Sequence, residues 1–240
     1  MATIDQLPDA PLLSVLMPVY NEISTIEQIL RRVHEVPLSK EIVVVDDGSQ
    51  DGTRDKLAEL AADPTGVPFR LFLQERNQGK GAAIRRAIAE AQGRICIIQD
   101  ADLEYDPGDY PHLIDPILKG NADAVYGSRF LGGPHRVLFF WHMMGNRFLT
   151  LLSNMLTNLN ISDMETCYKV IRTDLAKSLN LKSNRFEIEP EITTKLAKAG
   201  ARIYEVPISY AGRGYQEGKK IGWKDGFKAI WAIVRFRLAS

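Results

Sequence analysis

Through roughly the first hundred residues, apolar runs alternate with helix-like segments, and no other feature constrains the fold as strongly. Four apolar runs are predicted as strands, at residues 13–17, 41–46, 69–73 and 94–99. Between them apolar side chains recur at helical spacing, as at Ile26, Ile29 and Val33. Strands separated by roughly 10–15 helical residues are typical of crossover units. The sequence therefore predicts an α/β fold with a mostly parallel sheet flanked by helices.

Polar residues follow three of these predicted strands. They are Tyr20-Asn21-Glu22, Asp46-Asp47 and Asp100-Ala101-Asp102. Because ligands bind at the carboxyl ends of parallel strands, we expect these groups to converge on one edge of the sheet. Carboxylates at alternating positions suit a hard divalent cation, although an isolated pair of this kind can also be a solvated turn. Two unpaired acidic clusters would repel each other, and this favours a bridging metal or donor-rich ligand.

Composition limits the class of protein. The 240 residues are 45% hydrophobic, which allows a sizeable core and excludes a disordered chain or a disulfide scaffold. Thirty Lys and Arg balance thirty Asp and Glu, so no basic excess points to nucleic acid. Two cysteines, Cys96 and Cys167, favour a reducing compartment. The N-terminus has no basic signal region, and no run of about 18 apolar residues occurs, so we expect a cytoplasmic globular protein.

The segment Asn77–Gly81 raises the question of a nucleotide-binding loop. It fits neither the P-loop pattern nor G-x-G-x-x-G, which disfavours a P-loop kinase and a Rossmann dehydrogenase. Lys80 at a helix start is suited to meet a phosphate, and a plain helix-entry turn is the alternative. The four histidines show no metal-ligand spacing with the cysteines, and no G-x-S-x-G supports a serine hydrolase.

Taken together, four segments resemble the successive motifs of family 2 glycosyltransferases, which have the Rossmann-like GT-A fold. These segments are residues 15–22, 44–49, 77–81 and 100–102. Further along, the chain is similar to the dolichol-phosphate mannose synthase branch, which uses polyprenyl phosphates. That similarity is carried by residues 126–129, 162–163, 167–169, 187–191 and 206–208, together with Arg213.

The resemblance implies roles for individual residues. The positions that hold the nucleoside are matched by Pro18, Tyr20, Glu22, Val45 and Asp47. Asp100, Ala101 and Asp102 match the motif that binds Mg²⁺ or Mn²⁺ with the donor diphosphate. Glu104 stands where the branch often has Gln, and it adds a potential metal ligand. Arg129, Arg213 and Lys219 match basic positions that meet the donor diphosphate or the acceptor phosphate.

The mechanism implied is a single displacement with inversion, in which the metal stabilises the leaving nucleoside diphosphate. A hydroxyl acceptor would need a general base, whereas a polyprenyl phosphate is already ionised because its second pKa lies near 6. Asp163 matches the position proposed as the base. We expect it to orient acceptor or donor hydroxyl groups as much as remove a proton, and an aspartate that caps the next segment is the structural alternative.

Two apolar stretches bear on the membrane. Residues 143–159 carry an apolar stripe that an ordinary core-facing helix would also explain. The last stretch, 213–240, has seven basic and two acidic residues. Its lysines lie largely on the opposite side of the predicted helix from an aromatic face. That face comprises Trp223, Phe227, Ile230, Trp231 and Val234. A basic amphipathic helix predicts a peripheral membrane-surface element, and a helix packed on the sheet is the alternative.

We therefore expect a GT-A domain over residues 1–212 and a basic amphipathic helical segment over 213–240. The leading hypothesis is transfer of mannose from GDP-mannose to dolichyl or another polyprenyl phosphate at the cytoplasmic face of a membrane. Transfer of glucose from UDP-glucose to such a carrier or to a glycan hydroxyl is the alternative within the class. From another class, a silent nucleotide-sugar-binding module serving a membrane subunit also fits the resemblance.

Overall fold

The computed structural model describes residues 11–132, 134–137, 139–214 and 223–238, and of residues 223–225 and 227 it describes the backbone alone. The strands are β1 (Leu13–Val19), β2 (Lys40–Asp46), β3 (Arg70–Leu73), β4 (Ile95–Ile98), β5 (Ala124–Ser128), β6 (Lys169–Arg172) and β7 (Ile203–Pro207). The α-helices are α1 (Ile26–Glu35), α2 (Thr53–Ala62), α3 (Lys80–Glu90), α4 (Tyr110–Leu118), α5 (Phe140–Thr157), α6 (Thr173–Ser178), α7 (Ile188–Lys198) and α8 (Trp223–Leu238), and one 3₁₀ turn, η1 (Pro107–Asp109), precedes α4.

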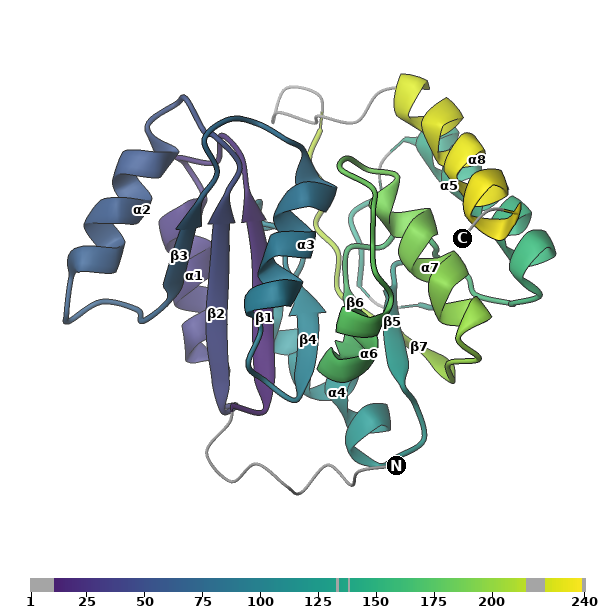
Figure 1. Ribbon diagram of the computed structural model, residues 1–240, viewed down its shortest axis with the longest axis horizontal. Helices are drawn as coiled ribbons and strands as arrows, with labels where there is room; N and C mark the ends of the chain where they lie inside the picture. Colours follow the sequence, from purple (N-terminus) through teal and green to yellow (C-terminus); the bar gives the residue numbers. More distant parts are fainter. Residues whose placement is uncertain (1–10, 133, 138, 215–222, 239–240) are drawn as a thin grey trace.

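The strands form one seven-stranded sheet in the order β3-β2-β1-β4-β6-β5-β7. The pairs β1–β2, β1–β4, β2–β3 and β5–β7 are parallel, and only β6 runs antiparallel to its neighbours β4 and β5. Figure 1 shows α3, α6 and α7 in front of the sheet and α1 and α4 behind it. The predicted α/β fold with a mostly parallel sheet is confirmed.

Local sequence explains the elements that carry the site. In β1 almost every side chain is buried, as expected for a central parallel strand covered on both faces. Helix α1 turns Ile26, Ile29 and Val33 toward the sheet on one stripe and leaves its charged residues outside. Because β1, β2 and β4 are parallel, the polar residues at their carboxyl ends lie at the same edge of the sheet.

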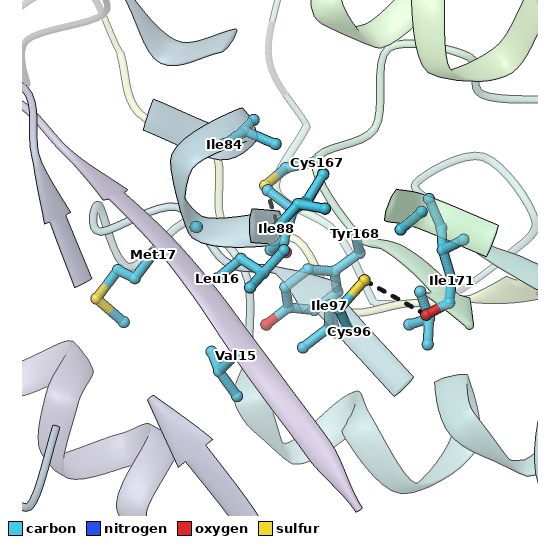
Figure 2. Packing of buried hydrophobic residues seen from close by; sticks show 14 of the residues in the cluster. Val15, Leu16, Met17, Ile84, Ile88, Cys96, Ile97, Cys167, Tyr168 and Ile171 are labelled. Carbon is cyan, nitrogen blue, oxygen red and sulfur yellow. Dashed lines mark hydrogen bonds between the residues drawn. The ribbon is translucent and has the colours of Figure 1, made fainter. Parts of the chain in front are cut away.

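The two cysteines lie in this core. Figure 2 shows the Cys96 thiol directed at the backbone of Ile171, with its Sγ 3.4 Å from the carbonyl oxygen. The Cys167 thiol lies 3.6 Å from the carbonyl oxygen of Ile98. Both are free thiols and both side chains are buried. Cys96 is thus a core residue of β4.

Helices α5 and α8 pack against each other at the end of the molecule where α7 also lies (Figure 1). Helix α8 buries Ala229, Ala232, Ile233 and Phe236. These residues occupy a different face from the predicted aromatic one, because Trp231 is 65% exposed. The interpretation that the aromatic face packs on the sheet is therefore wrong for Trp231. The side chains of Trp223 and Phe227 lie outside the described part of the structure.

The apolar stripe of α5 also differs from the core-facing expectation. Met144, Phe148, Leu151 and Met155 are exposed, whereas Leu152 and Leu156 pack partly against the core. The polar residues Thr150 and Ser153 are the buried positions of this helix. No helix in the described part of the chain is both long and apolar enough to cross a membrane.

Candidate active site

The carboxyl ends of β1 and β4 meet around the guanidinium of Arg213. Its Nη2 lies 2.8 Å from Oδ2 of Asp102, and its two Nη atoms each lie 3.3 Å from a carboxylate oxygen of Glu22. Its Nε donates to Oε1 of Glu104 at 3.3 Å, and its backbone N–H donates to the same oxygen at 2.9 Å. One cation is therefore shared by three acidic side chains.

Burial and neighbouring charges shift the pKa of Asp102 in this cluster. Burial, and after it the charges of Asp100 and Glu104, raise the pKa of Asp102 to about 7 against the opposing effect of Arg213. The Tyr210 hydroxyl donates to Oε2 of Glu104 at 2.7 Å and fixes that side chain. The carboxylates thus lie close enough to repel each other, which is the condition under which a divalent cation is attracted.

Asp100 belongs to a second group of paired charges. Lys80 Nζ, at the start of α3, lies 2.8 Å from Oδ1 of Asp100 and 3.4 Å from Oε1 of Glu189 on α7. The other oxygen of Glu189 accepts a hydrogen bond from the fully buried Lys169. Burial opposes the charge on Lys80, but Asp100 and its other neighbours hold the pKa of that amine above the ordinary value. Lys80 therefore pairs with protein carboxylates rather than facing open solvent.

The third part of the site is a fork between Arg129, after β5, and Asp163. Arg129 donates from Nε and Nη2 to the two oxygens of Asp163, both at 2.7 Å, and Asn146 of α5 adds a bond of 3.2 Å. Burial by itself raises the pKa of Asp163, but the Arg129 charge and these hydrogen bonds outweigh it and hold the pKa below the ordinary value. Asp163 is thus an ionised, fully buried carboxylate.

Both members of the acidic pair at the end of β2, Asp46 and Asp47, accept hydrogen bonds from the protein itself. Asp46 accepts from Nε of Arg54 at 2.8 Å. Asp47 accepts backbone N–H groups of Gln78 and Gly79 at 2.7 and 2.8 Å. Burial raises the pKa of Asp47, and these two hydrogen bonds oppose the rise. The expectation of two unpaired acidic clusters in need of a bridging ligand is therefore wrong, because each carboxylate has its own donor.

The other residues predicted to bind the nucleotide sugar are Pro18, Val45, Tyr20, Ala101 and Lys219. Pro18 and Val45 are direct partners in the β1–β2 register, so they can form one wall of a nucleoside pocket. Tyr20 is half-buried after β1, and Ala101 is buried between Asp100 and Asp102. Lys219 lies outside the described residues. The role of each as a ligand-binding residue stays a prediction.

The donor set fits a divalent cation by its chemistry. Asp100, Asp102 and Glu104 supply hard oxygen atoms, which Mg²⁺ and Mn²⁺ prefer. In the described ranges, however, no group of three or more Asp, Glu, His or Cys side chains is already gathered to hold a metal. Arg213 and Lys80 pair with these carboxylates, so a cation would have to replace at least one of these pairings.

No sequence pattern singled out four further residues of the site, which are Asn146, Glu189, Glu205 and Tyr210. Glu205 accepts the backbone N–H of Ser162 at 2.8 Å and that of Asp163 at 3.2 Å, and so fixes the loop that carries Asp163. Only Glu189 had a signal, since it lies within the segment 187–191 that carried the family resemblance. The others act through distant partners that no local pattern reveals.

Comparison with known proteins agrees with this geometry. The family model described as "Glycosyl transferase family 2" matches residues 14–179. This range runs from the second residue of β1 to beyond β6 and contains Glu22, Asp102, Arg129 and Asp163. The chain belongs to glycosyl transferase family 2.

Two curated relatives belong to the branch that uses polyprenyl phosphates. The dolichol-phosphate mannosyltransferase of Pyrococcus furiosus is 29% identical over 227 residues, covering 92% of this chain and 61% of the relative. The chain thus spans less than two thirds of that protein's length. The undecaprenyl-phosphate mannosyltransferase of Micrococcus luteus is 28% identical over 238 residues, covering 94% of this chain and 93% of the relative.

Solved structures share the fold at lower sequence identity. Glucosyl-3-phosphoglycerate synthase from Mycobacterium tuberculosis, in complex with Mn²⁺, UDP and phosphoglyceric acid, superposes with a TM-score of 0.71 at 20% identity. The superposition covers 95% of this chain and 79% of that one. The same enzyme with Mn²⁺ and UDP-glucose gives a TM-score of 0.70 at 19% identity, covering 100% and 83%. The GT-A fold expected from the family resemblance is confirmed.

Proposed function

We propose that this glycosyltransferase moves a hexose, with inversion, from a nucleoside-diphosphate sugar to a polyprenyl phosphate. The observation that carries the proposal is the row of paired charges at one edge of the sheet. Arg213, Lys80 and Arg129 each contact a carboxylate there. Phosphorylated substrates and a divalent cation can therefore enter by exchanging ion pairs, without adding net charge to a buried site. The names of the two curated relatives support a lipid-phosphate acceptor.

In the proposed reaction an oxygen of the acceptor phosphate forms a bond to the anomeric carbon of the hexose. The bond between that carbon and the donor diphosphate breaks at the same time, and the nucleoside diphosphate leaves with its electron pair. A divalent cation held by Asp100, Asp102 and Glu104 would stabilise that leaving group. Arg213 would supply a further positive charge beside it. Pro18, Tyr20, Glu22, Val45 and Asp47 would contact the nucleoside.

A phosphate nucleophile removes the need for a general base. Its second pKa lies near 6, so it is largely ionised at neutral pH. Asp163 fits this chemistry because its fork with Arg129 leaves it ionised and fixed in place. We assign Asp163 to holding Arg129, whose charge would meet the acceptor phosphate, and to orienting sugar hydroxyls. The alternative, an aspartate that caps the next segment, is not favoured, because the Asp163 oxygens contact the side chains of Arg129 and Asn146.

The donor and the place of action are the finer parts of the proposal. Mannose from GDP-mannose is the leading donor, because both curated relatives are named as mannosyltransferases. UDP-glucose is the second candidate, supported by its presence in a solved protein of the same fold. We infer peripheral association with the cytoplasmic face of a membrane, where the acceptor lipid would lie, with residues 1–212 as the GT-A domain and 213–240 as a C-terminal segment. A separate membrane subunit remains compatible with this arrangement.

The function is tested with purified protein, a short-chain polyprenyl phosphate and a panel of GDP-, UDP- and dTDP-sugars with Mg²⁺ or Mn²⁺. We expect release of nucleoside diphosphate and a glycosylated lipid phosphate, with GDP-mannose as the best donor. A protein that binds a nucleotide sugar but releases none of its nucleotide with any acceptor would instead be a silent binding module.

The acceptor chemistry has its own control. The matching polyprenyl alcohol should be a poor acceptor, and Asp163→Asn should lose less rate on the phosphate than the 10²–10⁴-fold, roughly, that a missing general base costs. Efficient transfer to the alcohol would overturn the phosphate-acceptor assignment while keeping a glycosyltransferase.

A further inference from the structure

The carboxyl group of Glu165 has no role in the site as described so far. Its Oε1 atom is buried and has no hydrogen-bond partner among the described residues. Buried polar atoms in folded proteins are almost always hydrogen-bonded, because an unpaired one costs as much free energy as its lost hydration. A buried acceptor without a donor, next to a candidate active site, therefore indicates a ligand that brings the donor.

Hydrogen bonds on both sides hold the backbone around Glu165 in place. The buried ammonium group of Lys169 donates to the carbonyl oxygen of Met164 at 2.9 Å and to that of Thr166 at 2.5 Å. The backbone N–H of Met164 donates to the hydroxyl of Thr150 at 3.2 Å. The side chain of Glu165 therefore starts from a fixed position, as a group that recognises a substrate must.

Glu165 adjoins two parts of the candidate site. It follows Asp163, which forms the fork with Arg129, by two residues. Burial, and after it the charge of Glu189, raise the pKa of Glu165 to about 7 against the opposing effects of Lys169 and Arg129. The charges of the Arg129–Asp163 fork and of the pair between Lys169 and Glu189 thus both reach this carboxyl group.

Glu189 supplies a second acceptor of the same kind. Its Oε1 is also buried and accepts no hydrogen bond from the described part of the chain, although the ammonium group of Lys80 approaches it at 3.4 Å. Its other oxygen accepts from Lys169. Glu165 and Glu189 therefore each keep one buried carboxylate oxygen that lacks a hydrogen bond.

The charges around Glu165 decide which class of ligand fits. A phosphate group would be repelled by the carboxylates of Glu165 and Glu189. A divalent cation would be repelled by Lys80 and Lys169, which already pair with Glu189. An uncharged group with several hydroxyls has neither conflict, and each hydroxyl can donate to a carboxylate oxygen. A sugar ring is such a group.

The position of Glu165 agrees with this class of ligand. In the proposed reaction the hexose lies between the donor diphosphate, on the side of Asp100, and the acceptor phosphate, which Arg129 would meet. Glu189 connects the neighbourhood of Glu165 to Asp100, because Lys80 pairs with both of these carboxylates. We propose that Glu165 determines sugar specificity by accepting a hydrogen bond from a hydroxyl group of the transferred hexose, with Glu189 accepting a second. The identity of this ligand rests on the proposed function.

Donor binding without an acceptor tests the proposal. Isothermal titration calorimetry with Mg²⁺ compares GDP-mannose with GDP, and UDP-glucose with UDP. Glu165→Ala should weaken binding of the sugar nucleotide that the wild type prefers by roughly tenfold to hundredfold, because a hydrogen bond to a carboxylate is lost. Binding of the matching nucleoside diphosphate should not change. Glu59→Ala, whose side chain is 72% exposed on α2, is the control and should bind both ligands as the wild type does.

A series of deoxy sugars identifies the contacted hydroxyl. Donors that lack the 2-, 3-, 4- or 6-hydroxyl of the hexose are bound in turn to the wild type and to Glu165→Ala. With one of them the wild type should lose about as much affinity as the alanine substitution costs, and the variant should lose nothing further. Losses that simply add for every analogue would overturn the proposed contact.

Stability separates sugar recognition from a structural role. Because Oε1 of Glu165 accepts no hydrogen bond from the described protein, Glu165→Ala should have a Tm equal to or above that of the wild type. Glu165→Gln keeps the shape and one acceptor oxygen, so it should lose less affinity for the sugar nucleotide, and it serves the same comparison if the alanine variant does not fold.

Two further results would overturn the proposal. One is unchanged binding of the sugar nucleotide by the Glu165 variants, and the other is a lower Tm with equal loss of affinity for the sugar nucleotide and the nucleoside diphosphate. None of these measurements uses a polyprenyl phosphate. Failure of transfer to that acceptor would therefore contradict the proposed function, whereas sugar recognition by Glu165 is judged by binding alone.

Discussion

Arg213 contacts carboxylates that come from two different strand ends, Glu22 after β1 and Asp102 and Glu104 after β4. A half-buried cluster of three negative charges would be costly without this cation. Because Asp102 and Glu104 are also predicted metal ligands, Arg213 and a divalent cation compete for these two carboxylates. Arg213 would then be released to contact a diphosphate when the metal binds.

Replacing Arg213 by Ala should therefore raise the affinity of the nucleotide-free protein for Mn²⁺. One unit charge near the ligands is worth roughly a threefold to thirtyfold change at a partly exposed site. Free Mn²⁺ measured by electron paramagnetic resonance gives the dissociation constant, and binding of the donor diphosphate should weaken in the same variant. Arg202→Ala, which removes a surface pairing with Asp123, is the control. Unchanged or weaker Mn²⁺ binding would show that Arg213 does not compete with the metal.

The fork between Arg129 and Asp163 predicts a defined pH dependence of stability. The pKa of Asp163 is lowered in the folded protein, so its contribution is complete above the unfolded value of about 3.9 and is lost as the pH falls through the folded value. Asp163→Asn leaves the buried Arg129 charge unpaired and should lower the free energy of unfolding by about 3–5 kcal/mol at pH 7.

Below about pH 4 this difference between wild type and variant should shrink, because the wild-type carboxyl becomes neutral as well. Urea unfolding at pH 7, 5 and 3 measures it. A difference that stays constant over this range would mean that Asp163 is not ionised in the folded protein.

At the scale of elements, the segment Asn77–Gly81 is shaped by packing between loop and helix. A Cβ atom on Gly81, at the start of α3, would lie 2.5 Å from the carbonyl oxygen of Ser183 and 2.9 Å from that of Arg185. A Cβ on Gly79 would collide with the carbonyl oxygen of Asn184. The glycines thus allow the loop 183–185 to approach α3, and this contact explains them without a phosphate.

Gly81→Ala should consequently destabilise the protein by about 1–3 kcal/mol, because backbone atoms must move to admit the methyl group. Gly145→Ala is the matched control, since a Cβ there meets nothing within 4 Å and the residue lies inside α5. That control should be neutral or stabilising by up to about 1 kcal/mol. Thermal unfolding measures the stability of both variants relative to the wild type. A Gly81→Ala protein as stable as the control would contradict the packing argument.

Across the whole molecule, the two halves of the sheet meet where β4 pairs with β6, and Cys96 and Cys167 both lie at this junction. Burial raises the pKa of Cys96 to about 12, and it raises that of Cys167 as well. Both thiols are therefore protonated and shielded in the folded state. They should react with a thiol reagent only when the sheet opens.

Labelling with a chromogenic disulfide in increasing urea measures this protection. The labelled fraction should rise together with the loss of circular dichroism, because both report opening of one core. Fast reaction of either thiol without urea would show that this part of the sheet opens independently.

The first half of the fold was predictable because its signals are local. The apolar runs and helical stripes between residues 13 and 99 correspond to β1 through β4 and α1 through α3. The second half was not, since β6 is only four residues long and inserts antiparallel between β4 and β5 after an 18-residue helix. Strand order depends on long-range pairing, which no local pattern specifies.

For the candidate site, local sequence is enough to predict which residue types follow the strands, and therefore which edge of the sheet carries the chemistry. The partners of these residues depend on folding, because Arg213 meets Asp102 across 111 residues of chain and Arg129 meets Asp163 across 34. The same holds for α5 and α8. Periodicity shows that a helix has an apolar side, but which side the core covers depends on the elements packed against it. In the structure, the buried face of α5 carries Thr150 and the buried face of α8 carries Ile233, whereas Trp141 and Trp231 are exposed.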